Sequence, residues 1–153
     1  MAYWLFKSEP ESFSIDDLRT AKTTIWDGIR NYQARNYLLT AAKGDLVFFY
    51  HSNAKPPGIV GLAKVTHLNV VDPTQFDESS HYYDATSKPS EPRWMTVKVG
   101  FVEKFRNELS LDLLKETFDP AELMVIRKGM RLSVTPVPDK VAAQILEMGR
   151  EKR

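Results

Sequence analysis

The stretch Ala2–Lys7 reads Ala-Tyr-Trp-Leu-Phe-Lys and decides the fold of this chain. Successive side chains of a strand point to opposite faces. Tyr3 and Leu5 therefore lie on one face, and Trp4 and Phe6 lie on the other. A strand that is apolar on both faces needs cover on both sides. We therefore predict a central strand here, with other elements packed above and below it.

Outward from this strand, the sequence predicts further strands and about four short helices. Strands are predicted over residues 23–26, 45–50, 59–71, 94–105 and 130–135, and helices over residues 32–43 and 111–118, from Ser14 and from Pro138. Strands and helices do not alternate strictly, which disfavours a doubly wound parallel sheet. Long strands marked by glycines favour a small mixed β-barrel of five or six strands with helices packed outside. The predicted fold class is α+β, as one domain over residues 1–150 with a frayed tail at 151–153.

The composition limits the function. Hydrophobic residues make up 42% and charged residues 27% of 153 residues, which excludes global disorder. No apolar run approaches a membrane span, the N-terminus does not resemble a signal peptide, and cysteine is absent. Disulfides, thiolate zinc sites and thiol catalysis are therefore excluded. We expect a cytoplasmic protein with no membrane partner and no cofactor, and we take a monomer as its simplest assembly.

The charge balance argues against bulk attraction to nucleic acid. The chain carries 21 basic and 20 acidic residues, a net charge of +1, whereas proteins that coat nucleic acid are strongly basic. A local site that holds one nucleotide remains open, with Arg30, Arg35, Lys55 and Lys64 as candidates for backbone contacts.

A long polar loop also stands out. Residues 72–93 are rich in Pro, Ser, Asp, His and Tyr, and a loop of this length inside a compact domain is usually functional or carries short structure of its own.

Motifs for catalysis are weak. His51, His67 and His81 are isolated from one another and from acidic clusters, which disfavours a metal site. Residues 58–61 contain two glycines but lack the lysine and helix of a phosphate-binding loop. Ser8, His51 and nearby acids could form a nucleophilic triad only by three-dimensional arrangement, and no G-x-S-x-G motif is present. We therefore expect no enzymatic activity.

Polar and aromatic residues follow apolar strands at three places. The segments are residues 7–10 (Lys-Ser-Glu-Pro), 26–31 (Trp-Asp-Gly-Ile-Arg-Asn) and 51–53 (His-Ser-Asn). In a barrel, such strand ends can converge on one mouth, where they would offer an indole face, hydroxyls, amides and cations. A flat heterocycle is bound by this combination of stacking and edge hydrogen bonds. Each residue alone also has an ordinary structural explanation: Trp26 as core, Asn31 as a helix cap and Ser8 as a turn residue.

The same segments resemble the EVE domain family. The resemblance rests on YWLFKSEP at residues 3–10, WDGIRNYQARN at residues 26–36 and GDLVFFYHS at residues 44–52. Residues 58–61, 72–77 and 92–94 extend it over nearly the whole chain. It implies a PUA-like fold related to YTH and ASCH domains. It also implies recognition of a modified base, such as 5-methyl- or 5-hydroxymethylcytosine in DNA, or a modified base in RNA.

The resemblance assigns roles to individual residues. In YTH relatives the tryptophan of an Ile-Trp pair forms part of an aromatic cage, and Ile25-Trp26 matches that pair. Trp26 is then a stacking wall, with one face open in the unbound protein. Lys7-Ser8 matches a Lys-Ser pair that holds the base edge, and Ser52-Asn53 matches the loop after the next strand. Met95-Thr96 stands where many members carry further aromatic residues, so a second wall is not supplied there.

The leading interpretation is a non-catalytic module that recognises a modified nucleobase. The alternatives are a PUA-like module that binds structural or transfer RNA, and a small nuclease or hydrolase that uses Lys7, Glu9 or His51. The expected binding residues are Lys7, Ser8, Glu9, Trp26, Arg30, Asn31, Arg35, His51, Ser52, Asn53 and Trp94.

Overall fold

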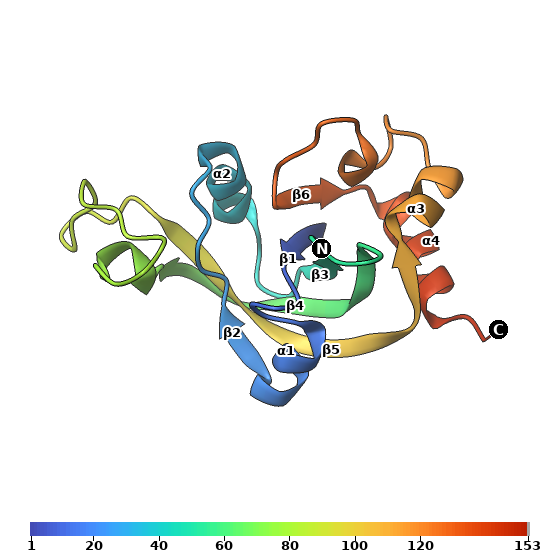
Figure 1. The fold of residues 1–153 in the computed structure, drawn as a ribbon, viewed down its shortest axis with the longest axis horizontal. Coiled ribbons are helices and arrows are strands. Elements are labelled where there is room, and N and C mark those ends of the chain that lie inside the picture. Colours follow the sequence, from blue (N-terminus) through green and yellow to red (C-terminus); the bar gives the residue numbers. More distant parts are fainter. Residues whose placement is uncertain (153) are drawn as a thin grey trace.

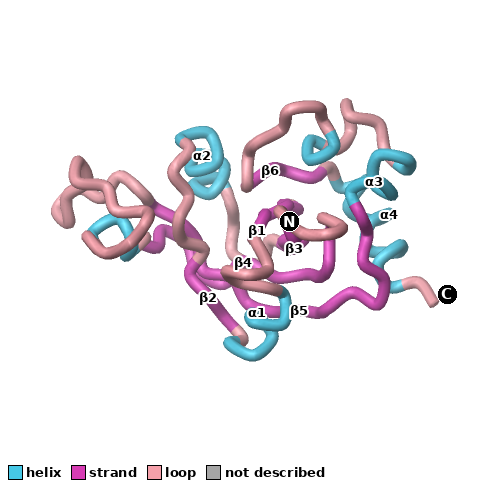
Figure 2. Tube along the Cα trace, in the orientation of Figure 1, coloured by secondary structure: helices cyan, strands magenta, loops and turns pink. Residues whose placement is uncertain are grey.

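The computed structural model describes residues 1–152, which form a six-stranded mixed sheet with four α-helices (Figures 1 and 2). The strand order is β2-β5-β4-β3-β1-β6. No helix among these residues is long and apolar enough to cross a membrane. In chain order the elements are β1 (Tyr3–Ser8), α1 (Ile15–Ala21), β2 (Thr23–Ile25), α2 (Tyr32–Thr40), β3 (Leu46–His51), β4 (Gly58–Val71), the 3-10 helix η1 (Pro73–Phe76), β5 (Met95–Ser110), α3 (Leu111–Thr117), the 3-10 helix η2 (Met124–Ile126), β6 (Val134–Val137) and α4 (Asp139–Arg150).

Strand β1 is covered on both faces, which confirms the prediction from its sequence. It runs parallel to β3 and antiparallel to β6. Trp4 and Phe6 belong to a core shared with α1 and α2. Leu5 belongs to a second core, shared with α3 and α4. The alternation along one strand therefore builds both cores of the molecule.

The sheet curls, but its edges do not meet. β4 and β5 pair along most of their length with several register shifts, and they bend around β1 and β3 (Figure 1). At Gly61 a Cβ atom would lie 2.6 Å from the Glu103 carbonyl oxygen, so the close approach of these strands requires glycine. Among the described residues β2 pairs only with β5 and β6 only with β1. The α+β class and six strands are thus confirmed. The sheet stays open because β2 is three residues long and α2 packs against β6.

The last strand begins later than the sequence pattern indicates. We predicted it over residues 130–135, whereas β6 spans Val134–Val137. Pro136 is tolerated because β6 is an edge strand. The preceding residues form a loop whose Ser133 carbonyl oxygen accepts a hydrogen bond from the Lys7 amide at 2.9 Å. Leu132 packs against the core from this loop, so its apolar alternation does not mark a strand.

The tail that we predicted to be frayed, residues 151–153, follows the end of α4. The Glu151 carbonyl oxygen accepts a hydrogen bond from the Asn107 side chain, and Arg153 lies outside the described residues.

A buried carboxylate joins the start of the chain to the start of β3. Asp45 is 2% exposed and accepts hydrogen bonds from the Ala2 amide at 3.0 Å, the Trp4 indole at 3.0 Å and the Ala42 amide at 2.8 Å. Burial raises the pKa of Asp45, but these three donors together outweigh it and hold the pKa below its usual 3.8.

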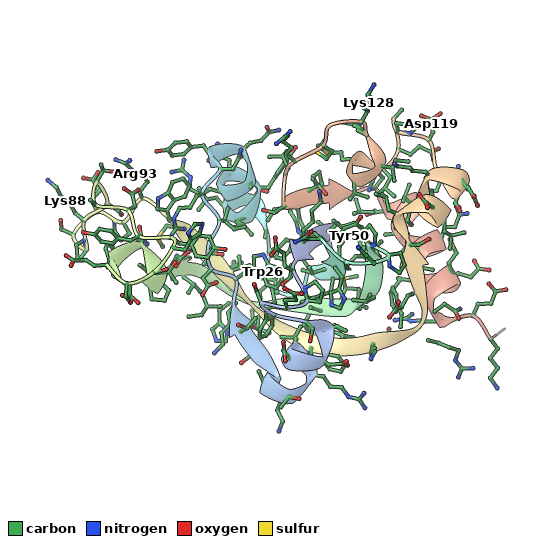
Figure 3. All side chains as sticks on the ribbon, in the orientation of Figure 1. Trp26, Tyr50, Lys88, Arg93, Asp119 and Lys128 are labelled. Carbon is green, nitrogen blue, oxygen red and sulfur yellow. The ribbon has the colours of Figure 1, made fainter. Side chains whose placement is uncertain are left out.

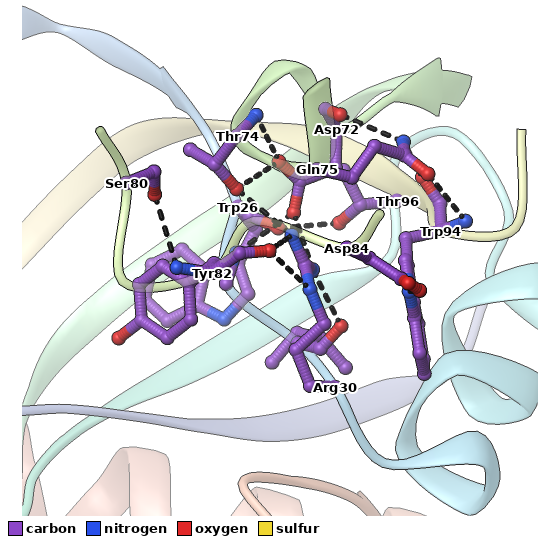
Figure 4. A network of polar contacts seen from close by, with 12 residues as sticks. Trp26, Arg30, Asp72, Thr74, Gln75, Ser80, Tyr82, Asp84, Trp94 and Thr96 are labelled. Atoms are coloured by element: carbon purple, nitrogen blue, oxygen red, sulfur yellow. Dashed lines mark hydrogen bonds and ion pairs between the residues drawn. The ribbon is translucent and has the colours of Figure 1, made fainter. Parts of the chain in front are cut away.

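A second buried carboxylate holds the long loop between β4 and β5. Asp72 accepts hydrogen bonds from the Gly28 amide at 2.8 Å, the Arg30 guanidinium at 3.0 Å and the Thr74 amide at 2.8 Å (Figure 4). Arg30 also donates to the Thr74 hydroxyl and to the Tyr82 carbonyl oxygen. Burial raises the pKa of Asp72, but its hydrogen bonds reverse the shift and keep it ionised. The segment after β2 and the long loop are therefore fixed to each other.

We expect Asp45→Asn to lower the free energy of unfolding by about 1–3 kcal/mol at pH 7, because an amide cannot accept from all three buried donors. Since the pKa of Asp45 is lowered in the folded state, its contribution is fully present well above pH 3.8 and is lost as the pH falls from there through the lowered pKa of the folded state. Urea unfolding at a series of pH values from 7 to about 2 should show the difference in unfolding free energy between wild type and variant narrowing below about pH 4. A gap independent of pH would contradict this assignment.

We expect Arg30→Lys to loosen the long loop, because an ammonium lacks the planar fork that reaches Asp72, Thr74 and Tyr82 together. The free energy of unfolding should fall by about 1.5–3 kcal/mol, which is the usual contribution of hydrogen bonds to charged groups. Chymotrypsin should cleave faster at the exposed Tyr82, measured by mass spectrometry of the first fragments. The control is Arg106→Lys at an exposed site, which should leave stability and cleavage unchanged.

Candidate functional site

The ends of β1 and β3 bring three of the expected residues together. Ser8 pairs with His51 in the parallel register, and the Ser52 amide donates to the Ser8 carbonyl oxygen at 3.0 Å. The Ser8 hydroxyl donates to the Phe13 carbonyl oxygen at 2.6 Å. Ser8, His51 and Ser52 are three of the seven residues that we expected around one concavity, and they are neighbours here. The Ser8 hydroxyl oxygen still has lone pairs that can accept from a ligand.

His51 is held as a neutral ring. Its Nε2 accepts a hydrogen bond from the Ile15 amide at 3.1 Å, so the proton of the neutral ring lies on Nδ1. Burial lowers the pKa of His51, outweighing the opposite effect of Glu108 and Asp16. The nitrogen that would act as a base is therefore engaged with the first turn of α1.

Lys7 lies on the other face of the sheet. Its ammonium is 5.9 Å from the centre of the Tyr50 ring, and Tyr50 belongs to the core shared with α3 and α4. Burial lowers the pKa of Lys7. Neighbouring residues of a strand point to opposite faces, so Lys7 and Ser8 lie on opposite sides of the sheet. This does not support our expectation that both line one concavity. Glu9 and Asn53 are exposed beside this end of the sheet.

Trp26 lies on the same face as Ser8 and His51, but it is buried. It is 7% exposed, and its ring centre lies 5.2 Å from that of Phe6 and 5.5 Å from that of Phe49. The open face that we expected in the unbound protein is absent. The physical reason is that the backbone still hydrogen-bonds to β5 after β2 ends: the Trp26 amide donates to Val97 and its carbonyl oxygen accepts from Thr96. The indole is thereby kept over the sheet.

Tyr82 is a neighbour of this segment that the sequence did not single out. Gly28 has a φ of 80°, and a Cβ there would lie 2.7 Å from the Tyr82 ring. Tyr82 as a residue is 41% exposed, and Figure 4 shows its ring beside the Arg30 network. In the same segment, burial and the negative charge of Asp72 together raise the pKa of Asp27. The length and composition of the 72–93 loop were the only signal that pointed to Tyr82.

The remaining expected residues form a second group on α2 and the long loop. The Asn31 side chain caps α2 by accepting from the Ala34 amide at 3.0 Å. Trp94 is 6% exposed, donates to Asp84 and stacks on Tyr32 with ring centres 5.0 Å apart. Arg35 lies 4.7 Å from the centre of the Tyr32 ring.

The expected residues thus fall into separate groups. Ser8 and His51 lie side by side where β1 and β3 end, with the Ser52 backbone next to them, and Trp26 lies on the same face of the sheet against Phe6 and Phe49. Asn31, Arg35 and Trp94 lie with the long loop, and Arg30 joins that loop to the segment after β2 through its contacts with Asp72 and Tyr82. Within residues 1–152, no group of three His, Asp or Glu side chains is placed to hold a metal ion.

Comparison with known proteins finds relatives whose sequences match most of this chain. The model of the EVE domain matches residues 2–148. Thymocyte nuclear protein 1 of Mus musculus is 42% identical over 164 aligned residues, which cover 95% of this chain and 73% of that protein. The human protein of the same name is also 42% identical, over 89% of this chain and 68% of its own length.

Solved structures agree over the whole fold. A protein of Pseudomonas syringae is 47% identical with a TM-score of 0.92, covering 96% of this chain and 99% of its own. Human thymocyte nuclear protein 1, solved in complex with DNA that contains 5-methylcytosine, is 38% identical with a TM-score of 0.91 and full coverage of both chains. An ASCH protein of Zymomonas mobilis, 12% identical with a TM-score of 0.50, shares the fold alone. By its sequence match and its PUA-like α+β fold, this chain belongs to the EVE domain family.

Proposed function

We propose that this protein is a non-catalytic module that binds a modified nucleobase, with 5-methylcytosine as the first ligand to test. The observation that carries the proposal is the human relative bound to DNA containing 5-methylcytosine, whose chain aligns with this one over its full length. The local geometry supports it, because the Trp26 indole lies on the face of the sheet on which Ser8 and the neutral His51 ring end β1 and β3.

The proposed base site lies between Trp26 and the end of β1. A flat base is held by stacking on an aromatic face and by hydrogen bonds along its edge. Trp26, which is 7% exposed in the unbound protein, supplies the face only after its neighbours rearrange, and Ser8, His51 and Ser52 supply edge groups. The base enters where the Tyr82 ring now covers Gly28, once that ring turns aside. Within residues 1–152 the Tyr82 side chain makes no hydrogen bond, although its backbone is fixed by Arg30 and Ser80.

The arrangement of candidate acids and bases favours binding over catalysis. Lys7 points to the opposite face from Ser8, Glu9 is exposed, and His51 Nε2 is bonded to the backbone of α1. General acid–base catalysis needs such groups within hydrogen-bond reach of one substrate. Recognition of RNA instead of DNA, the monomeric state and the cytoplasmic location remain predictions.

Titration of the wild-type protein with nucleosides and short single strands tests the proposed function. We expect 5-methylcytosine or another modified base to bind more tightly than its plain counterpart, with no product after prolonged incubation. Matched DNA and RNA strands show which sugar is preferred. Equal affinity for modified and plain bases would contradict base recognition, and product formation would contradict a non-catalytic module.

We expect Trp26→Leu to weaken binding of the modified base by about 1–3 kcal/mol, roughly 5- to 150-fold, because leucine fills part of the core but has no π face. The control is Trp4→Leu, the same change at another buried tryptophan of the same core. Both variants should lose stability, but only the first should lose affinity, measured by calorimetry below both melting temperatures. If Trp26→Leu bound the modified base with wild-type affinity, Trp26 would be a core residue with no part in base binding.

A further inference from the structure

We propose that a cavity between α2 and the long loop binds a backbone phosphodiester of the strand that carries the recognised base. This inference rests on the proposed function and adds a second contact to it. The cavity has a volume of about 350 Å³ and is lined by Arg35, Thr86, Lys88, Glu91, Pro92 and Arg93. Lys88 and Arg93 lie together at one end of the molecule, far from Lys128 and Asp119 (Figure 3).

The lining offers cationic donors that the fold leaves available. It carries three basic side chains and one carboxylate, in a chain with a net charge of only +1. Arg93 Nη1 is 3.8 Å from the nearest Asp84 oxygen, beyond hydrogen-bond reach. The Lys88 ammonium has no partner within residues 1–152. Arg35 uses three of its five N–H donors, on Asn36 and on the Arg93 carbonyl oxygen, which leaves two for a ligand.

The carboxylate closest to Arg93 is satisfied by other donors. Asp84 accepts from the Trp94 indole at 2.8 Å and from the Thr86 amide and hydroxyl. The hydrogen bonds from Thr86 and Trp94 lower the pKa of Asp84 to about 2. Asp84 therefore holds the loop together as an anion, and the Arg93 guanidinium remains available to a phosphate.

The wall of the cavity is fixed before any ligand arrives. Gln75 is fully buried, donates to the carbonyl oxygens of Asp72 and Trp94, and accepts from the Ser87 hydroxyl and the Trp94 amide. Both ends of the 87–94 segment are thus tied to one side chain. Between them, the Glu91 amide donates to the Lys88 carbonyl oxygen at 2.9 Å and closes a tight turn. A fixed wall lowers the ordering cost of binding a phosphate.

The cavity also lies at a suitable distance from the base site. Arg93 lies four residues before Val97, whose carbonyl oxygen accepts from the Trp26 amide. Four residues of extended chain span about 13 Å. A nucleic-acid strand rises about 3.4 Å per nucleotide, so this span matches roughly four nucleotide steps. A strand whose base stacks on Trp26 can therefore place a nearby phosphate in the cavity.

The test compares wild type with the K88A/R93A double variant on 5-methylcytosine nucleoside and on single-stranded DNA and RNA containing that base. Each phosphate contact contributes about 0.7 to the slope of log affinity against log salt. Because the cavity holds one phosphodiester, we expect the double variant to lose about 0.7 from this slope on strands, with weaker binding to modified and plain strands alike. Its affinity for the nucleoside, which has no phosphate, should stay unchanged.

The matched control is R106A/K115A, which removes two exposed positive charges from β5 and α3. A wild-type slope in K88A/R93A, or an equal loss in the control, overturns the phosphate site. Loss on both DNA and RNA assigns the contact to the phosphodiester, whereas loss on only one of them contradicts it. If the nucleoside fails to bind wild type while strands show the expected loss of slope, the phosphate site stands and the proposed base recognition fails.

Discussion

The buried carboxylate of Asp72 is the constraint on which the long loop and the segment after β2 depend. It is 1% exposed, so an unpaired charge there would be strongly destabilising. Its partners come from two segments that the chain separates by more than forty residues: Gly28 and Arg30 on one side, Thr74 on the other. The only way to satisfy the carboxylate is to bring these segments together. The left-handed turn at Gly28 and the course of the long loop both follow from that requirement.

A second buried carboxylate acts in the same way at the start of β1. Asp45 collects donors from the first residues of the chain and from the connection between α2 and β3. Both carboxylates sit at junctions between elements, and the two cores around them are almost wholly apolar. Polar groups inside this protein therefore set the positions of connecting segments, while apolar burial supplies the general driving force for folding.

Local patterns in the sequence were sufficient for much of the fold but for little of the site. The alternation in Trp4, Leu5 and Phe6 predicts a covered strand, and Asn31 predicts a helix cap, because both follow from the positions of neighbours in the chain. The pattern of polar residues after apolar strands placed Ser8 and His51 near the same end of the sheet. The exposure of Trp26 could not be predicted, since it depends on Phe6 and Phe49 from other strands.

Charged residues were the least predictable, because their roles depend on partners far along the chain. Arg30 was expected to contact a ligand, yet Asp72, Thr74 and Tyr82 occupy its guanidinium. Lys88 belongs to no sequence motif, and Arg93 belongs only to the stretch 92–94 that extends the family resemblance. Both gain their interest from the cavity that they share with Arg35.

The parallel pairing of β1 with β3 has a consequence for folding kinetics. Ser8 and His51 face each other only after α1, β2 and α2 have crossed over between their strands. Parallel pairing requires such a crossover and is dominated by contacts distant in sequence, which slows folding. No short peptide from this chain can contain the base site, and partly folded intermediates lack it. The capacity to bind therefore appears cooperatively with the sheet, so binding of a nucleobase would report directly on completed folding.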